Sequence, residues 1–157
     1  MLNIITFFYI FFVFCNLSYE IHRSESPIFF MYVISICFFT DIGGYVFGKI
    51  IGGKKLSKIS PNKTIAGTVG SFISSIIPLI IVLNFNYINL EFNLTNIMFC
   101  LLISLISQIG DLFISFIKRK ATIKDTGNLL PGHGGILDRV DGIIFAVPFS
   151  YFLLKLF

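Results

Sequence analysis

Long apolar runs alternate with short polar stretches along most of the 157-residue chain. A helix needs about 20 apolar residues to cross the hydrocarbon core of a membrane. Five runs approach this length, at residues 2–19, 28–50, 65–85, 94–117 and 142–157. The pattern predicts an all-α fold, namely a polytopic transmembrane helix bundle with about five spanning helices and irregular polar loops between them.

Composition supports this prediction and excludes a water-soluble domain. Hydrophobic residues make up 55% of the chain and charged residues 13%, which is about half the charged share of a typical soluble domain. We expect residues 1–157 to form a single integral-membrane domain, in which 1–27 supply an N-terminal span and a short external loop. The first run has neither a basic start nor a small-residue cleavage site, so we interpret it as a retained span and not as a signal peptide.

The chain contains three cysteines. Cys15, Cys37 and Cys100 lie in apolar runs, so we expect buried small side chains and infer neither disulfides nor a zinc site.

Ten of the 12 basic residues fall in the stretches 49–63 and 118–139. The positive-inside bias places both stretches in the cytoplasm, with the C-terminus outside the inner (cell) membrane.

The net charge of +4 does not indicate nucleic-acid binding. The cations flank apolar runs and are not interleaved with exposed aromatic residues. This arrangement suits the membrane surface or a small phosphorylated ligand better than it suits nucleic acid. For several of these lysines, a role in membrane topology alone fits equally well.

Two carboxylates interrupt apolar runs. Asp111 shares a helix face with Ser115 and Lys118, which follow at i+4 and i+7. A carboxylate in such a run needs a cation, a metal ion or a water-filled cleft beside it, and a simple salt bridge to a lysine is one alternative. Asp41 ends another apolar run, and the glycines that follow it permit either close helix packing or a broken helix.

Two polar segments carry further candidate chemistry. The segment SPNKT at 60–64 predicts a turn and a helix start, where backbone N–H groups and Lys63 could hold a phosphate, although a plain helix cap has the same pattern. In the segment 124–142, Asp138 and Asp141 are spaced i, i+3 around Arg139. Its glycines predict an irregular backbone that a ligand can approach closely. His133 lies within it, where a structural hydrogen bond is as good an interpretation as a metal ligand.

These residue types point to one class of chemistry. Hard oxygen ligands without a Cys and His cluster favour Mg²⁺ over zinc. Mg²⁺ with nearby Lys and Arg is typical of phosphate chemistry, in which the metal ion neutralises charge on the phosphates. The residues alone therefore predict a membrane enzyme that acts on a phosphorylated substrate with the help of Mg²⁺.

A longer match goes further. The run SFIKR…KDTGNLLPGHGGILDRVD at 115–141 resembles the signature of phosphatidate cytidylyltransferases, also called CDP-diacylglycerol synthases. DIGGY at 41–45 and SPNKT at 60–64 are similar to two further motifs of that family, in the expected order. The resemblance covers about residues 38–157, the expected catalytic core. It implies transfer of CMP from CTP to phosphatidic acid at the lipid bilayer, in phospholipid biosynthesis, and it leaves a homodimer open.

The resemblance also implies roles for individual residues. The metal ligands, for Mg²⁺ with or without a second cation, would be Asp111 and Asp138. The catalytic group would comprise Lys118, Lys124, Asp125, Arg139 and Asp141. The substrate-binding group would comprise Asp41, Ser60, Lys63, Thr64, Arg119 and His133.

Other functions stay open at this point. One is a CTP-dependent transferase that acts on a different lipid. Another is a catalytically inactive or truncated family member that serves as a membrane subunit. The second is motivated by Ala66, which stands where the family usually has an acidic residue shortly after the SPNKT-type motif.

Overall fold

The computed structural model describes residues 9, 14–24, 27–56, 60, 63–85, 90–123 and 137–156, except for the side chains of 22, 24 and 137–139. Within these residues the fold is all-α, as predicted, with one isolated bridge between Lys55 and Thr64. The helices are α2 (Cys15–Ser24), α3 (Pro27–Ile50), α4 (Ile65–Ser74), α5 (Ile77–Phe85), α6 (Leu94–Lys120) and α7 (Leu137–Leu156).

Three stretches are long and apolar enough to cross a membrane, namely Pro27–Ile50, Ile65–Phe85 and Leu94–Lys120. They coincide with the predicted spans 28–50, 65–85 and 94–117, and they make the chain a multi-pass membrane protein. The predicted span 2–19 lies mostly outside the described residues. Helix α7 begins five residues before the predicted start at 142, and its crossing of the membrane stays a prediction.

The span Ile65–Phe85 is broken into two helices, which the apolar pattern did not predict. Helix α4 ends at Ser74, and α5 begins at Ile77. Pro78 has no N–H and therefore cannot donate to the carbonyl of Ser74, so the series of helical backbone hydrogen bonds is interrupted here. The Ser75 hydroxyl donates to the carbonyl of Phe72 over 2.7 Å, which satisfies one backbone group near the break.

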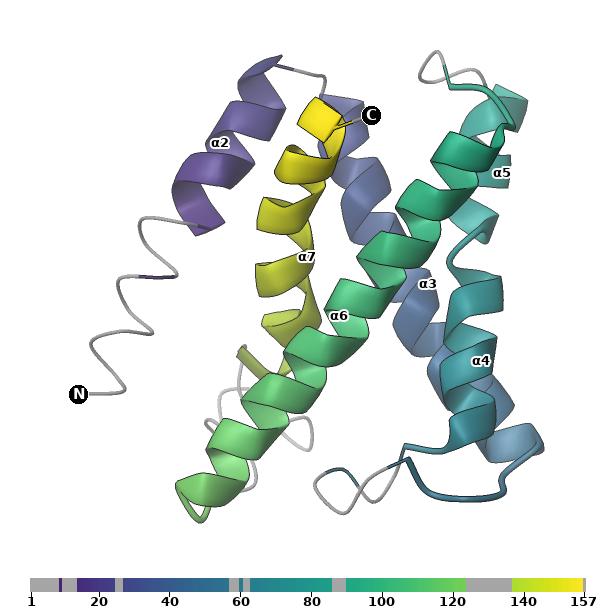
Figure 1. Cartoon of the computed structure of the whole chain (residues 1–157), viewed down its shortest axis with the longest axis vertical. Coiled ribbons are helices and arrows are strands. Elements are labelled where there is room, and N and C mark those ends of the chain that lie inside the picture. The colour runs from purple at the N-terminus through teal and green to yellow at the C-terminus, as the bar shows by residue number, and fades with distance from the viewer. Residues whose placement is uncertain are drawn as a thin grey trace.

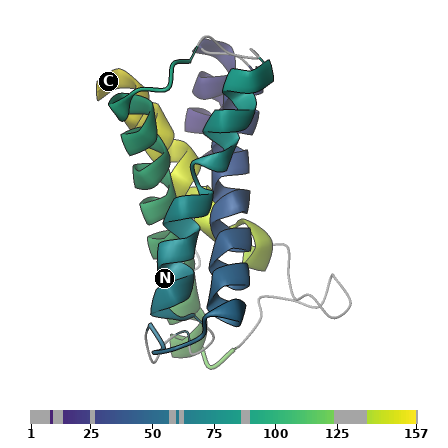
Figure 2. The ribbon, with the colours of Figure 1, turned by 90° about the vertical axis from the view of Figure 1, so that its right-hand side faces the viewer.

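Helices α3 and α4 lie side by side in both views of the ribbon (Figure 1, Figure 2). Glycines make this close approach possible. A Cβ added at Gly67 would stand 2.6 Å from the carbonyl oxygen of Gly44, and one added at Gly43 would stand 2.7 Å from the carbonyl oxygen of Gly70. The packing interpretation of the glycines near Asp41 is therefore correct, and α3 continues unbroken past them.

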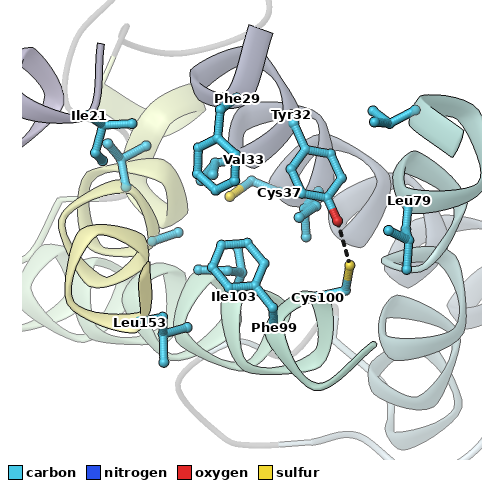
Figure 3. Packing of buried hydrophobic residues seen from close by; sticks show 14 residues of the cluster. Ile21, Phe29, Tyr32, Val33, Cys37, Leu79, Phe99, Cys100, Ile103 and Leu153 are labelled. Atoms are coloured by element: carbon cyan, nitrogen blue, oxygen red, sulfur yellow. Dashed lines mark hydrogen bonds between the residues drawn. The ribbon is translucent and has the colours of Figure 1, made fainter. Parts of the chain in front are cut away.

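The hydrophobic core occupies one half of the bundle. It joins the first halves of α3 and α6 to the later part of α7, with residues of α2 and α5 at its edges (Figure 3). Tyr32 and Phe99 stack within it, and the Tyr32 hydroxyl lies 3.1 Å from the Cys100 sulfur. Cys37 and Cys100 are buried as predicted. Cys15 is exposed, so the prediction for it is wrong: its helix leaves this side chain outside the core.

The described parts of both basic stretches lie in the other half of the bundle. Helices α3 and α6 both end there, and α4 and α7 both begin there (Figure 1). The last turn of α3 contains Lys49, and the last turn of α6 contains Lys118, Arg119 and Lys120. Both basic stretches therefore start at this end of the bundle. The arrangement agrees with the predicted topology, in which the two stretches face the same side of the membrane.

Candidate active site

A polar cavity of about 500 Å³ lies in this half of the bundle. Helices α3, α4, α6 and α7 contribute to its wall together with the loop before α4. The lining residues are Asp41, Gly44, Tyr45, Ser60, Lys63, Thr64, Gly67, Thr68, Ser71, Gln108, Asp111 and Asp141. Six of the residues predicted from the sequence thus surround a single cavity.

The start of α4 holds one side of the cavity. Thr64 caps the helix, and its hydroxyl oxygen accepts a hydrogen bond from the Gly67 N–H over 3.0 Å. The Ile65 N–H donates to the carbonyl of Lys54. These bonds occupy two of the N–H groups that could have held a phosphate. The segment's clearest means of binding an anion is therefore the Lys63 ammonium group, which forms an ion pair with Asp111 of α6.

Asp141 lies against Asp111 from the first turns of α7. Its side chain is almost fully buried, and the charge of the neighbouring Asp111 carboxyl group acts on it. One of its carboxyl oxygens accepts a hydrogen bond from the Gly142 N–H over 2.9 Å. Gly142 permits the approach of α7 to α6, because a Cβ there would stand 2.9 Å from the carbonyl oxygen of Ser107. Burial, and then the neighbouring Asp111 charge, raise the pKa of Asp141 well above the ordinary aspartate value.

A third carboxylate completes the cluster. Asp41 of α3 lines the same cavity and interacts electrostatically with both Asp111 and Lys63. Lys118 lies 4.0 Å from Asp141. Lys63 thus faces two of the three carboxylates, and Lys118 faces the third. A site of this kind favours additional positive charge, as a proton or a metal ion.

The acid pair has the chemistry that a Mg²⁺ ion requires. Mg²⁺ usually binds one or two carboxylates and completes its shell with water and substrate phosphates. Asp111 and Asp141 provide two such groups, and a bound cation would offset the repulsion between their charges. Among the described residues, no group of three or more His, Cys, Asp or Glu could hold a metal ion by itself. Asp111 and Asp141 are therefore the pair whose carboxylates could contribute to holding a metal ion.

The other predicted residues fall in three places. Ser60 and Thr64 line the cavity, and their substrate-binding role stays a prediction. Arg119 is exposed at the end of α6 and does not line it. The predictions for Lys124, Asp125 and His133 lie outside the described residues. For Asp138 and Arg139 the structure gives only the helical backbone, in the first turn of α7.

Sequence reasoning missed several residues of the cavity wall. Gln108 is the clearest, because it precedes Asp111 by three positions and shares its helix face. An amide side chain in an apolar stretch of helix could have identified Gln108 as a candidate from the sequence. Thr68 and Ser71 follow Thr64 along one face of α4, but threonine and serine are common in membrane helices. Ala66, where the family usually has an acid, is half-buried in α4 and does not line the cavity.

Comparison with known proteins adds an independent result. A sequence profile described as "Cytidylyltransferase family" matches residues 1–157. The chain is 42% identical over 133 residues to a phosphatidate cytidylyltransferase of Staphylococcus haemolyticus, which covers 84% of this chain and 51% of that protein. It is 43% identical over 132 residues to the phosphatidate cytidylyltransferase of Bacillus subtilis, covering 80% of this chain and 47% of that one. The chain spans about half the length of the curated relatives it matches.

Proposed function

The chain belongs to the cytidylyltransferase family, and on this basis we propose that it transfers CMP from CTP to phosphatidate. The products would be CDP-diacylglycerol and pyrophosphate. The two relatives described above carry the name of this activity, and their similarity extends over most of this chain.

The observation that best supports the proposal is the meeting of Lys63, Asp111 and Asp141 at one cavity of a membrane-spanning bundle. The three residues come from three separate parts of the chain. A lysine beside paired carboxylates can bind phosphates directly and through a divalent cation. A cavity among membrane helices can receive a lipid from the bilayer and a nucleotide from water.

The reaction needs little covalent help from the protein. A phosphate oxygen of phosphatidate attacks the α-phosphorus of CTP, and a new P–O bond forms. The bond between the α-phosphorus and the bridging oxygen breaks, and its electron pair leaves with pyrophosphate. Because the nucleophile is already anionic, no strong base is required. The main barrier is the repulsion between two polyanions, which fixed positive charge and correct alignment reduce.

The described residues divide this work. Lys63 would bind a phosphate oxygen in exchange for its ion pair with Asp111, which is the contact that supports this role. Lys118, 4.0 Å from Asp141, would stabilise the ionised form of that carboxyl group. Asp111 and Asp141 would hold Mg²⁺, which would neutralise charge on the phosphates of CTP. Asp138, whose side chain lies outside the description, would join them as a further ligand.

We place the cavity on the cytoplasmic side of the cell membrane. The described parts of both basic stretches lie at the same end of the bundle as the cavity. A bias of Lys and Arg toward the cytoplasmic side is the general rule for membrane proteins. This orientation would give CTP direct access to Lys63.

A direct assay tests the proposal. The purified full chain is mixed with CTP, phosphatidate and Mg²⁺, and the formation of CDP-diacylglycerol is followed. Asp111→Asn serves as the control, because it keeps the size of the side chain and removes its charge. We expect product with the wild-type chain at well above the rate of the control. Equal product formation by both proteins, or none by either, would refute the proposed function.

A further inference from the structure

Gln108 occupies a part of the cavity that the proposed reaction does not use. It lies on α6 three residues before Asp111, which is about 4.5 Å along the helix axis toward the hydrophobic half of the bundle. We call the cavity residues Asp41, Thr68, Ser71 and Gln108 the inner wall. They contact the cavity from α3, α4 and α6.

The hydrogen bonds of the inner wall leave Gln108 available. Its amide nitrogen donates to the Ser104 hydroxyl over 3.3 Å, and among the described residues its second N–H and its carbonyl oxygen have no recorded partner. The hydroxyl protons opposite are already used. Ser71 donates to the carbonyl of Thr40 over 2.8 Å, and Thr68 donates to the carbonyl of Thr64 over 3.2 Å.

Gln108 is therefore the donor that the inner wall can offer to a ligand. Asp41, the remaining member, only accepts hydrogen bonds when it is ionised. An amide within an apolar helix is unfavourable unless it is satisfied, and this one faces the cavity. A ligand with an acceptor oxygen at this depth would satisfy it.

A diacyl lipid has such an oxygen in the right place. If the lipid phosphate lies near Lys63 and Asp111, the ester groups of the same molecule lie several ångströms closer to the acyl chains. Gln108 is displaced from Asp111 in the same direction, because it lies closer than Asp111 to the apolar half of the bundle along α6. The nucleotide approaches from the opposite end, where the basic residues are.

We propose that Gln108 is a lipid-binding residue, whose second amide N–H donates a hydrogen bond to an ester carbonyl oxygen of the glycerolipid substrate. The inference rests on the proposed function and goes beyond it. It gives this enzyme a preference for ester-linked over ether-linked lipids, since the ether analogue has no carbonyl oxygen at that position.

The experiment measures kinetics with two lipids, diacylglycerol phosphate and its dialkyl ether analogue of equal chain length. The proteins are the wild-type chain, Gln108→Met and Ile109→Ala. Methionine has a similar length and volume but no amide. Ile109 is on the same helix, is exposed and does not line the cavity, so its variant is the matched control. Thermal unfolding in detergent confirms that each variant is folded.

We expect the wild type to prefer the diacyl lipid in kcat/KM by roughly tenfold, the value of one neutral hydrogen bond in a desolvated site. Gln108→Met should lose this preference through a higher KM for the diacyl lipid, with the KM for CTP unchanged. Ile109→Ala should keep the wild-type preference.

Two results would overturn the inference while the proposed function stands. One is an active Gln108→Met variant with the same ester preference as the wild type. The other is a change that falls on the KM for CTP, which would assign Gln108 to the nucleotide. A wild-type chain that makes no product from either lipid is a different result, because it refutes the proposed function itself.

Discussion

The Lys63 ammonium group forms an ion pair with the Asp111 carboxylate, although Lys63 lies in the loop before α4 and Asp111 lies within the span Leu94–Lys120. Asp141 lies close enough to the same carboxyl group for the Asp111 charge to raise its pKa. Asp111 is therefore the residue through which the loop before α4 and the start of α7 meet on α6. Any phosphate or metal ion that enters the cavity has to reorganise the contacts of this one carboxylate.

Lys63→Met should leave the chain folded and impair its reaction. The substitution removes the cation that faces Asp111, and both side chains are partly exposed, so the loss of the ion pair should change stability little. The loss of phosphate binding should lower kcat/KM by about tenfold or more. Steady-state kinetics with varied CTP and varied lipid would measure it. Lys63→Arg is the control. Wild-type kinetics of the Lys63→Met variant would contradict the assignment of Lys63 to phosphate binding.

Asp111→Asn should reduce turnover by about 100-fold or more, since a divalent cation contributes several kcal/mol to such reactions. The variant should also bind Mn²⁺ more weakly when binding is followed by electron paramagnetic resonance without substrate. Asp41→Asn gives a useful comparison, because Asp41 lines the same cavity from α3 and is not one of the two proposed metal ligands Asp111 and Asp141. We expect it to retain more metal affinity. An Asp111→Asn protein with normal Mn²⁺ affinity contradicts the assignment.

The raised pKa of Asp141 predicts a pH-dependent stability in the presence of a chelator. The folded state holds this proton more tightly than the unfolded state does, so folding is most favoured at low pH for this group. That contribution is lost as the pH rises above about 4, the ordinary aspartate value, and passes through the raised pKa. Unfolding temperatures in detergent across this range would show it. Asp141→Asn should flatten the dependence, and an equally steep curve in that variant would place its origin elsewhere.

Gly67→Ala should force α3 and α4 apart beside the cavity. The added Cβ would stand 2.6 Å from the Gly44 carbonyl oxygen, which is a backbone atom that cannot turn away. Overpacking of this kind destabilises a protein by about 1–3 kcal/mol. We expect a lower unfolding temperature and lower activity together. Val69→Ala, at an exposed position of α4, is the control; equal unfolding temperatures for the two variants would show that the contact is looser than described.

Much of the fold could be predicted because a membrane span is a simple pattern. The length of the apolar runs located α3 and α6 to within a few residues at each end. The break between α4 and α5 was missed because apolar residues continue through it, and only Pro78 marks it. The start of α7 was placed too late because its first turn is polar, although the i, i+3 spacing of Asp138 and Asp141 is compatible with a helix.

The candidate site could be predicted where charge interrupts an apolar helix. Asp41 and Asp111 stood out for that reason, and both line the cavity. The contact of Lys63 with Asp111 could not be derived, because no local pattern says which of the basic residues reaches which acid. Gln108 was missed because an uncharged amide is a weaker signal, and its importance depends on what faces it.

The most direct test of the central claim is an experimental structure of the chain with Mn²⁺ and a non-hydrolysable CTP analogue. Anomalous scattering would locate the metal ion. We predict a Mn²⁺ ion bound by Asp111 and Asp141 and shared with phosphate oxygens of the nucleotide, with Lys63 turned from Asp111 to those oxygens. A metal ion bound elsewhere, with Lys63 and Asp111 still paired beside the bound nucleotide, would contradict the account.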